Sequence, residues 1–372
     1  MQLALSDGRI AELGYCYNVL PGESVAALVD QIRRICGPVR ARLGVARLGV
    51  GLWIARDAAT ELIRDPAARR QLATALAAEQ LYCFTLNGFP YGGFHAPRVK
   101  EQVFEPSWAQ PARLDYTLDL ATILAELLPD DVANGSISTV PIGSAQTDRA
   151  AARDGLARAA DGLAAIAQRT GRRIELAVEP EPGAGFERAT ELATYLRGSN
   201  VGICFDCCHA AVVGEDPAAA LAALAAAGVR CAKIQISSAL VAREPERDAA
   251  ALAALAEPRY FHQVRSDRGS AMDLPDALES LDRGSPWRIH FHVPVHRAEL
   301  AGFATTRDAI APVLAAAIAT LGPLPHLEVE TYTWGVLPTA DRATGDSALV
   351  DGIANELRWA IDELANHGAH PR

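Results

Sequence analysis

The sequence predicts an α/β fold in which eight strand–helix units close into a parallel (β/α)8 barrel, or TIM barrel, forming a single domain over residues 1–372. Short apolar runs alternate with amphipathic segments seven times in strict order, which predicts a parallel sheet with right-handed crossovers. Runs such as IELAVE are typical of strands that helices cover on both faces. Eight such units in 372 residues fit a closed barrel with insertions better than an open sheet.

The first seven strands can be placed directly from these runs. They are expected over residues 13–18, 48–54, 82–88, 135–143, 174–180, 201–206 and 229–237. The intervening helices are expected near 22–36, 58–79, 111–128, an Ala-rich segment ending at about 169, 187–197 and 216–227. An open doubly wound sheet is the alternative fold. It would usually carry a glycine-rich phosphate loop after an early strand, and neither GxGxxG nor a P-loop motif occurs here.

Two segments compete for the eighth strand, residues 287–296 and residues 326–334. The later one precedes a predicted helix near 346–366, as a closing strand–helix unit should. The earlier one is therefore assigned to an insertion of about 238–300 between strands seven and eight.

Composition narrows the class of partner. The formal net charge is −10 and the pI about 5.4, which argues against nucleic acid as a partner. The seven cysteines are an odd number and several fall in predicted strands, which favours a reducing compartment over a disulfide framework. No apolar run reaches the ~18 residues of a membrane span, and the N-terminus does not read as a signal peptide. We expect a cytoplasmic protein without membrane insertion that acts on a small-molecule metabolite.

Polar side chains end four successive predicted strands. These ends carry Glu179, Asp206, Gln235 and Glu330. Because side chains at the carboxyl ends of barrel strands converge on one mouth, we expect them to form a cluster of oxygen donors. Such a cluster suits one divalent ion of Mn, Mg or Co, and addition of His209 or His292 makes Zn a further possibility.

The same residues have simpler interpretations. An acid at a strand end is often a solvated loop residue or caps the next helix, and an Asp-x-x-His pattern is common by chance. His290 and His292 lie on one face of their predicted strand, where a structural pair is as reasonable as a site pair. His95 and Lys100 lie in a long loop after the third strand, where they either bind an anionic group or are simply solvated.

The motif order AVEPEP, FDCCH, KIQIS and LEVETY, over about residues 170–335, resembles the xylose-isomerase-like barrel superfamily, which includes sugar epimerases and endonuclease-IV-type phosphodiesterases. The resemblance implies that Glu179, Asp206 and Glu330 hold the metal, and that the two glutamates also serve as catalytic acid and base. It implies that His209 contacts the substrate. Gln235 stands where the epimerases have His, which replaces an imidazole by a weaker, neutral oxygen donor.

Within that superfamily the chain is most similar to the EboE-type metabolite traffic proteins. The similarity lies in GYCYNVLPGES, FTLNGFPYGGFHAPRVKEQVF, FDCCHAAV and LEVETYTWGVLP. It implies that a metabolite precursor is handled or exported, with partners from the same biosynthetic or export pathway. The trinuclear phosphodiesterases need further His ligands at the second and third strand ends, where this chain has Trp53 and Asn87.

Three functions follow in order of preference. The first is a metal-dependent isomerase or epimerase, in which Glu179 and Glu330 move a proton that the metal has acidified. The second is a metabolite-binding or trafficking protein without turnover, and the third is a metal-dependent phosphoesterase. For each of them we expect the substrate to be contacted by Asn18, Asn87, His95, Lys100 and His262.

Overall fold

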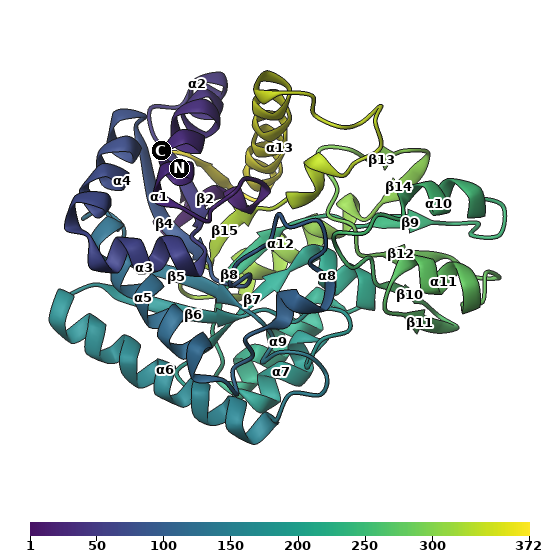
Figure 1. Ribbon diagram of the computed structural model, residues 1–372, viewed down its shortest axis with the longest axis horizontal. Coiled ribbons are helices and arrows are strands. Elements are labelled where there is room, and N and C mark those ends of the chain that lie inside the picture. Colours follow the sequence, from purple (N-terminus) through teal and green to yellow (C-terminus); the bar gives the residue numbers. More distant parts are fainter.

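The computed structural model describes residues 1–372 and contains a closed barrel of eight parallel strands (Figure 1). The barrel strands are β2 (Ile10–Cys16), β3 (Leu48–Trp53), β4 (Leu81–Asn87), β5 (Asn134–Thr139), β6 (Arg173–Val178), β7 (Gly202–Asp206), β8 (Cys231–Ile236) and β15 (His326–Val329). The sheet closes because β15 pairs in parallel with both β8 and β2. This confirms the predicted TIM barrel and excludes the open sheet, in which the first and last strands would not meet.

Helices surround the barrel (Figure 1). They are α1 (Val25–Gln31), α2 (Gly37–Leu43), α3 (Arg56–Arg64), α4 (Pro66–Ala78), α5 (Pro111–Leu127), α6 (Arg149–Thr170), α7 (Ala189–Tyr195), α8 (Cys207–Val213), α9 (Pro217–Ala227), α12 (Ile310–Thr320) and α13 (Asp346–Asn366). No single helix is long and apolar enough to cross a membrane, and only α8 and α9 taken together, bent by 108°, meet a criterion of length and composition.

Two predicted helices are interrupted. The helix expected over 22–36 starts as α1, passes through a π-helical turn at Ile32–Cys36 and continues as α2. The helix expected over 58–79 is split between α3 and α4, because Pro66 cannot donate a backbone hydrogen bond within a continuous helix. Asp65 caps the new start by accepting a hydrogen bond from the Ala67 amide.

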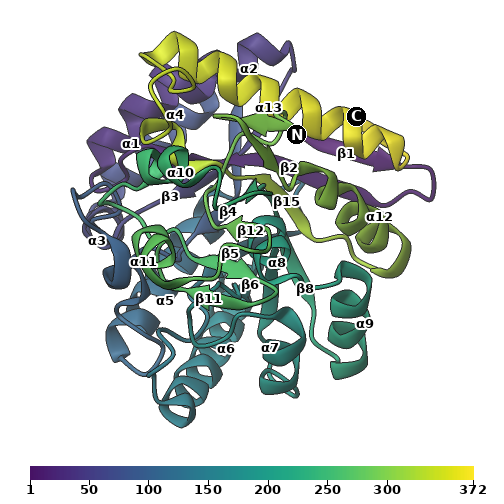
Figure 2. The same cartoon turned by 90° about the vertical axis from the view of Figure 1, so that its right-hand side faces the viewer.

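The predicted insertion forms a second, smaller sheet between β8 and α12. Its elements are β9 (Leu240–Ala242), α10 (Ala249–Leu255), β10 (Val264–Ser266), β11 (Gly269–Ala271), α11 (Leu274–Ser280), β12 (Trp287–Ile289), β13 (Glu299–Leu300) and β14 (Phe303–Thr305). The strands pair in the order β11-β10-β12-β9-β14-β13 and share a separate apolar cluster. Figure 2 shows this insertion in front of the barrel strands. The segment 287–296 belongs to it, as the sequence indicated.

The chain termini meet beside the barrel. The strand β1 (Gln2–Leu5) pairs antiparallel with the first residues of β2, and β16 (Ala369–Pro371) pairs antiparallel with β1. Both additions extend the sheet without entering the ring, because β15 and β3 already occupy the two edges of the later part of β2.

The seven cysteines are all free and buried, as expected for packing residues.

A buried ion pair crosses the barrel interior. The Nζ atom of Lys233 lies 2.5 Å from Oε2 of Glu328, and both side chains are fully buried. Lys233 also donates to the hydroxyl of Ser138 at 3.2 Å. Glycine is required at position 51 on the facing strand, because a Cβ atom there would lie 1.3 Å from Glu328 Oε1. The positive charge of Lys233 therefore balances the negative charge of Glu328 inside the barrel.

Candidate metal centre at the barrel mouth

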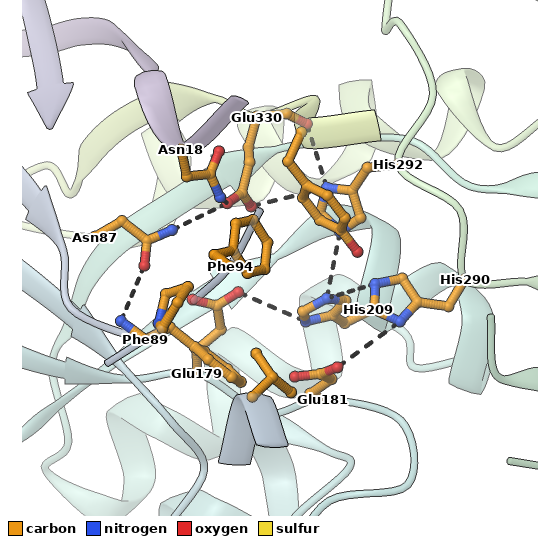
Figure 3. Close-up of a pocket in the computed structure, with 13 residues that line it drawn as sticks. Asn18, Asn87, Phe89, Phe94, Glu179, Glu181, His209, His290, His292 and Glu330 are labelled. Atoms are coloured by element: carbon orange, nitrogen blue, oxygen red, sulfur yellow. Dashed lines mark hydrogen bonds and ion pairs between the residues drawn. The ribbon is translucent and has the colours of Figure 1, made fainter. Parts of the chain in front are cut away.

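A small cavity opens where the carboxyl ends of the barrel strands meet the insertion (Figure 3). Its volume is about 50 Å³, which is room for a few water molecules at ~10–15 Å³ each. It is lined by Asn18, Asn87, Phe89, Pro90, Phe94, Val103, Glu179, Glu181, His209, His290, His292, Glu330 and Tyr332. One part of this lining is acidic, one part is imidazole and the outer cover is aromatic.

Three acids form a compact oxygen cluster. Carboxylate oxygens of Glu179, Asp206 and Glu330 lie within 4.8 Å of one another. Each residue stands at, or one position beyond, the carboxyl end of its strand, namely β6, β7 and β15. Oxygens around one cation at about 2.0–2.6 Å have separations of this order. The acids that the sequence predicted as metal ligands are therefore brought together.

Neighbouring amides hold two of these acids. Asn18 and Asn87 donate from Nδ2 to Glu330 Oε1, at 2.7 and 3.1 Å. Gln235 donates from Nε2 to Glu179 Oε2 at 3.1 Å. The Oε1 atom of Gln235 is buried and has no hydrogen-bond partner, which leaves it available as an additional oxygen donor. These amides fix the carboxylates without neutralising them.

The acid cluster is electrostatically unfavourable by itself. Burial, with repulsion from Asp206 and Glu328, raises the pKa of Glu330 to about 8. Burial and the charges of Glu330 and Asp206 raise the pKa of Glu179 well above its ordinary value. Burial also raises the pKa of Asp206. A divalent cation would offset both the lost hydration and the mutual repulsion. The donor set therefore fits the divalent ion expected from the sequence.

The capping interpretation of Asp206 is also correct. Its Oδ1 accepts the amide hydrogen of His209 at 2.7 Å and so caps α8, which begins at Cys207. Its Oδ2 accepts a hydrogen bond from Ser237 at 2.9 Å. The Asp-x-x-His spacing has a structural cause, because the cap places the first turn of α8 so that His209 faces the cavity lined by Glu179.

Three histidines form the other wall. His209 comes from α8, whereas His290 and His292 come from the segment that follows β12 in the insertion. Figure 3 shows the three rings facing one another. Burial lowers the pKa of His209 to about 3, that of His292 to about 4 and that of His290 well below 6.5. The rings are therefore neutral, which is the form that binds metals.

Three of the predicted substrate-binding residues do not line the cavity. His95 Nε2 is 2.9 Å from the carbonyl oxygen of Asn18 and packs beside the strand ends instead. Lys100 forms a buried ion pair with Asp273 of the insertion. Neither side chain lines the cavity, so their geometry does not support a direct substrate contact.

His262 is the third of these residues. Its Nδ1 lies 2.9 Å from the His290 carbonyl oxygen and its Nε2 lies 3.1 Å from Glu257. The ring stacks on Phe291 with centroids 4.2 Å apart. With both ring nitrogens engaged, His262 supports the segment that carries the cavity histidines and does not face a ligand.

The sequence analysis missed several residues of the cavity. Glu181 lines it and is held by Gln263, whose Nε2 lies 3.3 Å from Glu181 Oε1. His290 was noted without being assigned as a ligand. The aromatic cover, Phe94 and Tyr332, with ring centroids 5.3 Å apart, carried no local signal of function. The signal that could have identified His290 was its spacing of two residues from His292, which places both side chains on one face of an extended segment.

The fold and this cluster define a TIM-barrel protein with a candidate divalent-cation site at the strand ends. A family model described as Xylose isomerase-like TIM barrel matches residues 49–311. Because this match covers more than half of the chain, the protein belongs to that family. Among curated proteins, none matches the sequence.

Solved structures share the fold. A putative sugar phosphate isomerase/epimerase from Anabaena variabilis has a TM-score of 0.53 at 16% identity, covering 96% of this chain and 99% of that one. D-psicose 3-epimerase has a TM-score of 0.51 at 12% identity, with 95% and 99% covered. The IOLI protein, whose structure contains a zinc atom, has a TM-score of 0.50 at 13% identity, with 96% and 99% covered. At these identities the likeness concerns the fold alone.

Proposed function

We propose that the protein is a metal-dependent isomerase or epimerase that acts on a small hydroxy-carbonyl metabolite. The observation that carries the proposal is that two glutamates, Glu179 and Glu330, face one small cavity and share a cluster with Asp206. A divalent ion held there would polarise the substrate oxygens and acidify the C–H between them. Membership of a family related to sugar isomerases and epimerases favours the same chemistry.

The placement of the two glutamates supports a proton transfer between them and a bound substrate. Glu179 follows β6 and Glu330 follows β15, with β7 and β8 between them in the barrel, so the two side chains enter the cavity from different strands. Asn18 and Asn87 orient the Glu330 carboxylate through its Oε1, which leaves Oε2 to take up or release a proton. Transfer between two such positioned groups typically contributes ~10²–10⁴-fold to the rate.

The outer cover keeps water from the reacting atoms. Phe89, Phe94 and Tyr332 close the cavity, which is too small for a sugar-sized ligand. The loop 88–104 is fastened to the insertion, since the amides of Val99 and Lys100 donate to the carbonyl of Arg259 at 2.8 and 3.0 Å. We propose that this loop moves aside to admit the substrate and closes again over it.

We further propose the specific role of an EboE-type metabolite traffic protein, with partners from the same biosynthetic or export pathway. It rests on the long motif FTLNGFPYGGFHAPRVKEQVF, which forms the end of the third barrel strand, β4, and the loop that covers the cavity. A carrier without turnover is the alternative, because metal-mediated binding needs the same acids. A phosphoesterase is less favoured, since no Lys or Arg lines the cavity to bind a phosphate.

Proton exchange distinguishes the enzyme from the carrier. Purified protein, stripped of metal and then reloaded with Mn²⁺, Mg²⁺, Co²⁺ or Zn²⁺, is incubated in D₂O with a panel of hydroxy-ketones and hydroxy-aldehydes. We expect deuterium to enter a carbon-bound position of at least one compound, detected by NMR, only with the reloaded protein. A compound that binds in calorimetry but never exchanges would establish the carrier.

A further inference from the structure

Glu181 is a buried acid at the barrel mouth that the acid cluster does not use. Its side chain is only 9% exposed and lines the cavity. It lies outside the group formed by Glu179, Asp206 and Glu330, so the divalent ion does not account for it. Figure 3 shows its carboxylate beside the rings of the cavity histidines. A buried carboxylate needs a partner, because removing its charge from water costs free energy.

The protein itself gives this carboxylate only weak compensation. Its one side-chain donor is Gln263, whose Nε2 lies 3.3 Å from Oε1 and has a shorter contact of 2.8 Å with the Pro182 carbonyl oxygen. His290 Nδ1 lies 3.9 Å from the same Oε1, but its hydrogen is directed to Gln263 Oε1 at 2.6 Å. The His290 ring is neutral, so it adds no positive charge. The charge of Glu181 therefore remains largely unbalanced.

No basic side chain around this space is free to balance Glu181. Neither Lys nor Arg lines the cavity. Lys100 lines an adjoining void of about 30 Å³ together with Glu181, but it forms a buried ion pair with Asp273. Arg265, on β10, pairs with Glu187. A divalent ion would offset two of the three charges of the acid cluster, so the mouth keeps a net negative charge even with the metal bound.

Aromatic rings surround the same space. Phe94 and Tyr332 line both the cavity and the adjoining void, and Tyr260 lines the void. Their ring centroids lie 5.3 Å apart for Phe94 and Tyr332, 5.1 Å for Phe94 and Tyr260, and 4.9 Å for Tyr260 and Tyr332. The faces of such rings attract ammonium groups. A buried carboxylate beside several aromatic rings is therefore suited to a cationic ligand.

We propose that Glu181 and these aromatic rings bind a protonated amino group, and that the substrate is an amino-substituted hydroxy-carbonyl compound. The reacting half of this substrate rests on the proposed function, whereas the amino group rests on Glu181. The hydroxy-carbonyl oxygens would reach the divalent ion while the ammonium group donates to Glu181. An ammonium group is about as large as a water molecule, so the cavity of about 50 Å³ admits it.

Binding of two small probes to the full-length protein, loaded with Mg²⁺, tests the subsite without any turnover. The probes are 2-amino-1,3-propanediol and glycerol, which differ by an amino group that is protonated at neutral pH. Mg²⁺ prefers oxygen ligands, so the amine does not compete for the metal. In calorimetry we expect the amine to bind about ten- to a hundredfold more tightly than glycerol, the range that a hydrogen bond to a charged group supplies.

Three variants assign that preference to its residues. Glu181→Gln keeps the size of the side chain and removes its charge, so the amine should bind within about twofold of glycerol. Phe94→Leu leaves Glu181 in place and removes one ring, which should weaken amine binding about two- to thirtyfold. Glu187→Gln is the matched control, because Glu187 lies on the same segment outside the cavity, and it should keep the preference.

Three results would each overturn the subsite. They are equal affinity of the wild type for the two probes, absence of amine binding, and an amine preference that survives Glu181→Gln. Deuterium exchange into neutral hydroxy-ketones, measured on the wild type, decides the proposed reaction separately. Failure of the amino-group subsite and failure of the proposed reaction therefore give different results.

Discussion

Replacement of Glu330 by Gln is expected to slow carbon-bound deuterium exchange by two or more decades while the protein remains folded. Gln keeps the size of the side chain and one oxygen donor, but it removes the charge and the proton acceptor. Loss of a positioned general base typically costs about 10²–10⁴-fold. The acceptor for the amides of Asn18 and Asn87 survives in the Gln carbonyl, so the cavity should keep its shape. The rate of deuterium uptake, followed by NMR on reloaded protein, measures the effect.

The control for this substitution is Glu187→Gln. Glu187 lies outside the cavity, where it pairs with Arg265, so its replacement should leave the exchange rate within about twofold of wild type. Elemental analysis of both variants separates weaker metal binding from loss of the base. Exchange that persists at the wild-type rate in metal-loaded Glu330→Gln would remove Glu330 as the base.

The largest expected effect on stability is that of Lys233→Met. The substitution leaves the Glu328 carboxylate buried in the barrel without its cation, which should cost about 3–5 kcal/mol of the free energy of unfolding. Replacing both residues, in the double variant Lys233→Met with Glu328→Leu, removes both charges and should recover most of that loss. Urea unfolding followed by circular dichroism measures the differences.

A surface pair provides the comparison. Arg34 and Asp346 are each about half exposed, and Arg34→Met should change the unfolding free energy by no more than about 1 kcal/mol. A loss of unfolding free energy for Lys233→Met as small as that for Arg34→Met would contradict the stabilising role of the internal ion pair between Lys233 and Glu328.

Much of the fold could be predicted from the sequence because its signals are local. Each barrel strand is a short apolar run, and six of the eight strands end within two residues of the predicted end. The fourth and eighth strands end earlier than predicted, at Thr139 and Val329. The eighth strand was assigned to the correct segment, because a closing strand should be followed by a helix and the sequence predicts one near 346–366. The breaks in the first two helices were missed because they depend on single residues, such as Pro66, within segments that otherwise favour a helix.

The acid cluster was predictable for a topological reason. Strand ends of a closed barrel must converge, so Glu179, Asp206 and Glu330 were expected to meet without any knowledge of distances. Lys233 was overlooked as an internal cation, because a single lysine within an apolar strand does not reveal its partner on another strand. That partner, Glu328, is almost a hundred residues away in the chain.

The imidazole cluster could not be assigned from sequence for a different reason. His290 and His292 lie in an insertion whose path over the mouth is set by its own small sheet, and no periodicity predicts that docking. His262, in contrast, was expected to contact the substrate but does not line the cavity. It shares the insertion and its residue type with the ligand candidates, yet both of its ring nitrogens are occupied by protein acceptors.

The most direct test of the central claim is anomalous diffraction from crystals grown with Mn²⁺. A cation at the acid cluster predicts a manganese peak within about 2.6 Å of carboxylate oxygens of Glu179, Asp206 and Glu330. Protein crystallised with excess Mn²⁺ that shows no peak at these three carboxylates, or shows one only at the surface, would contradict a metal centre at the mouth of the barrel.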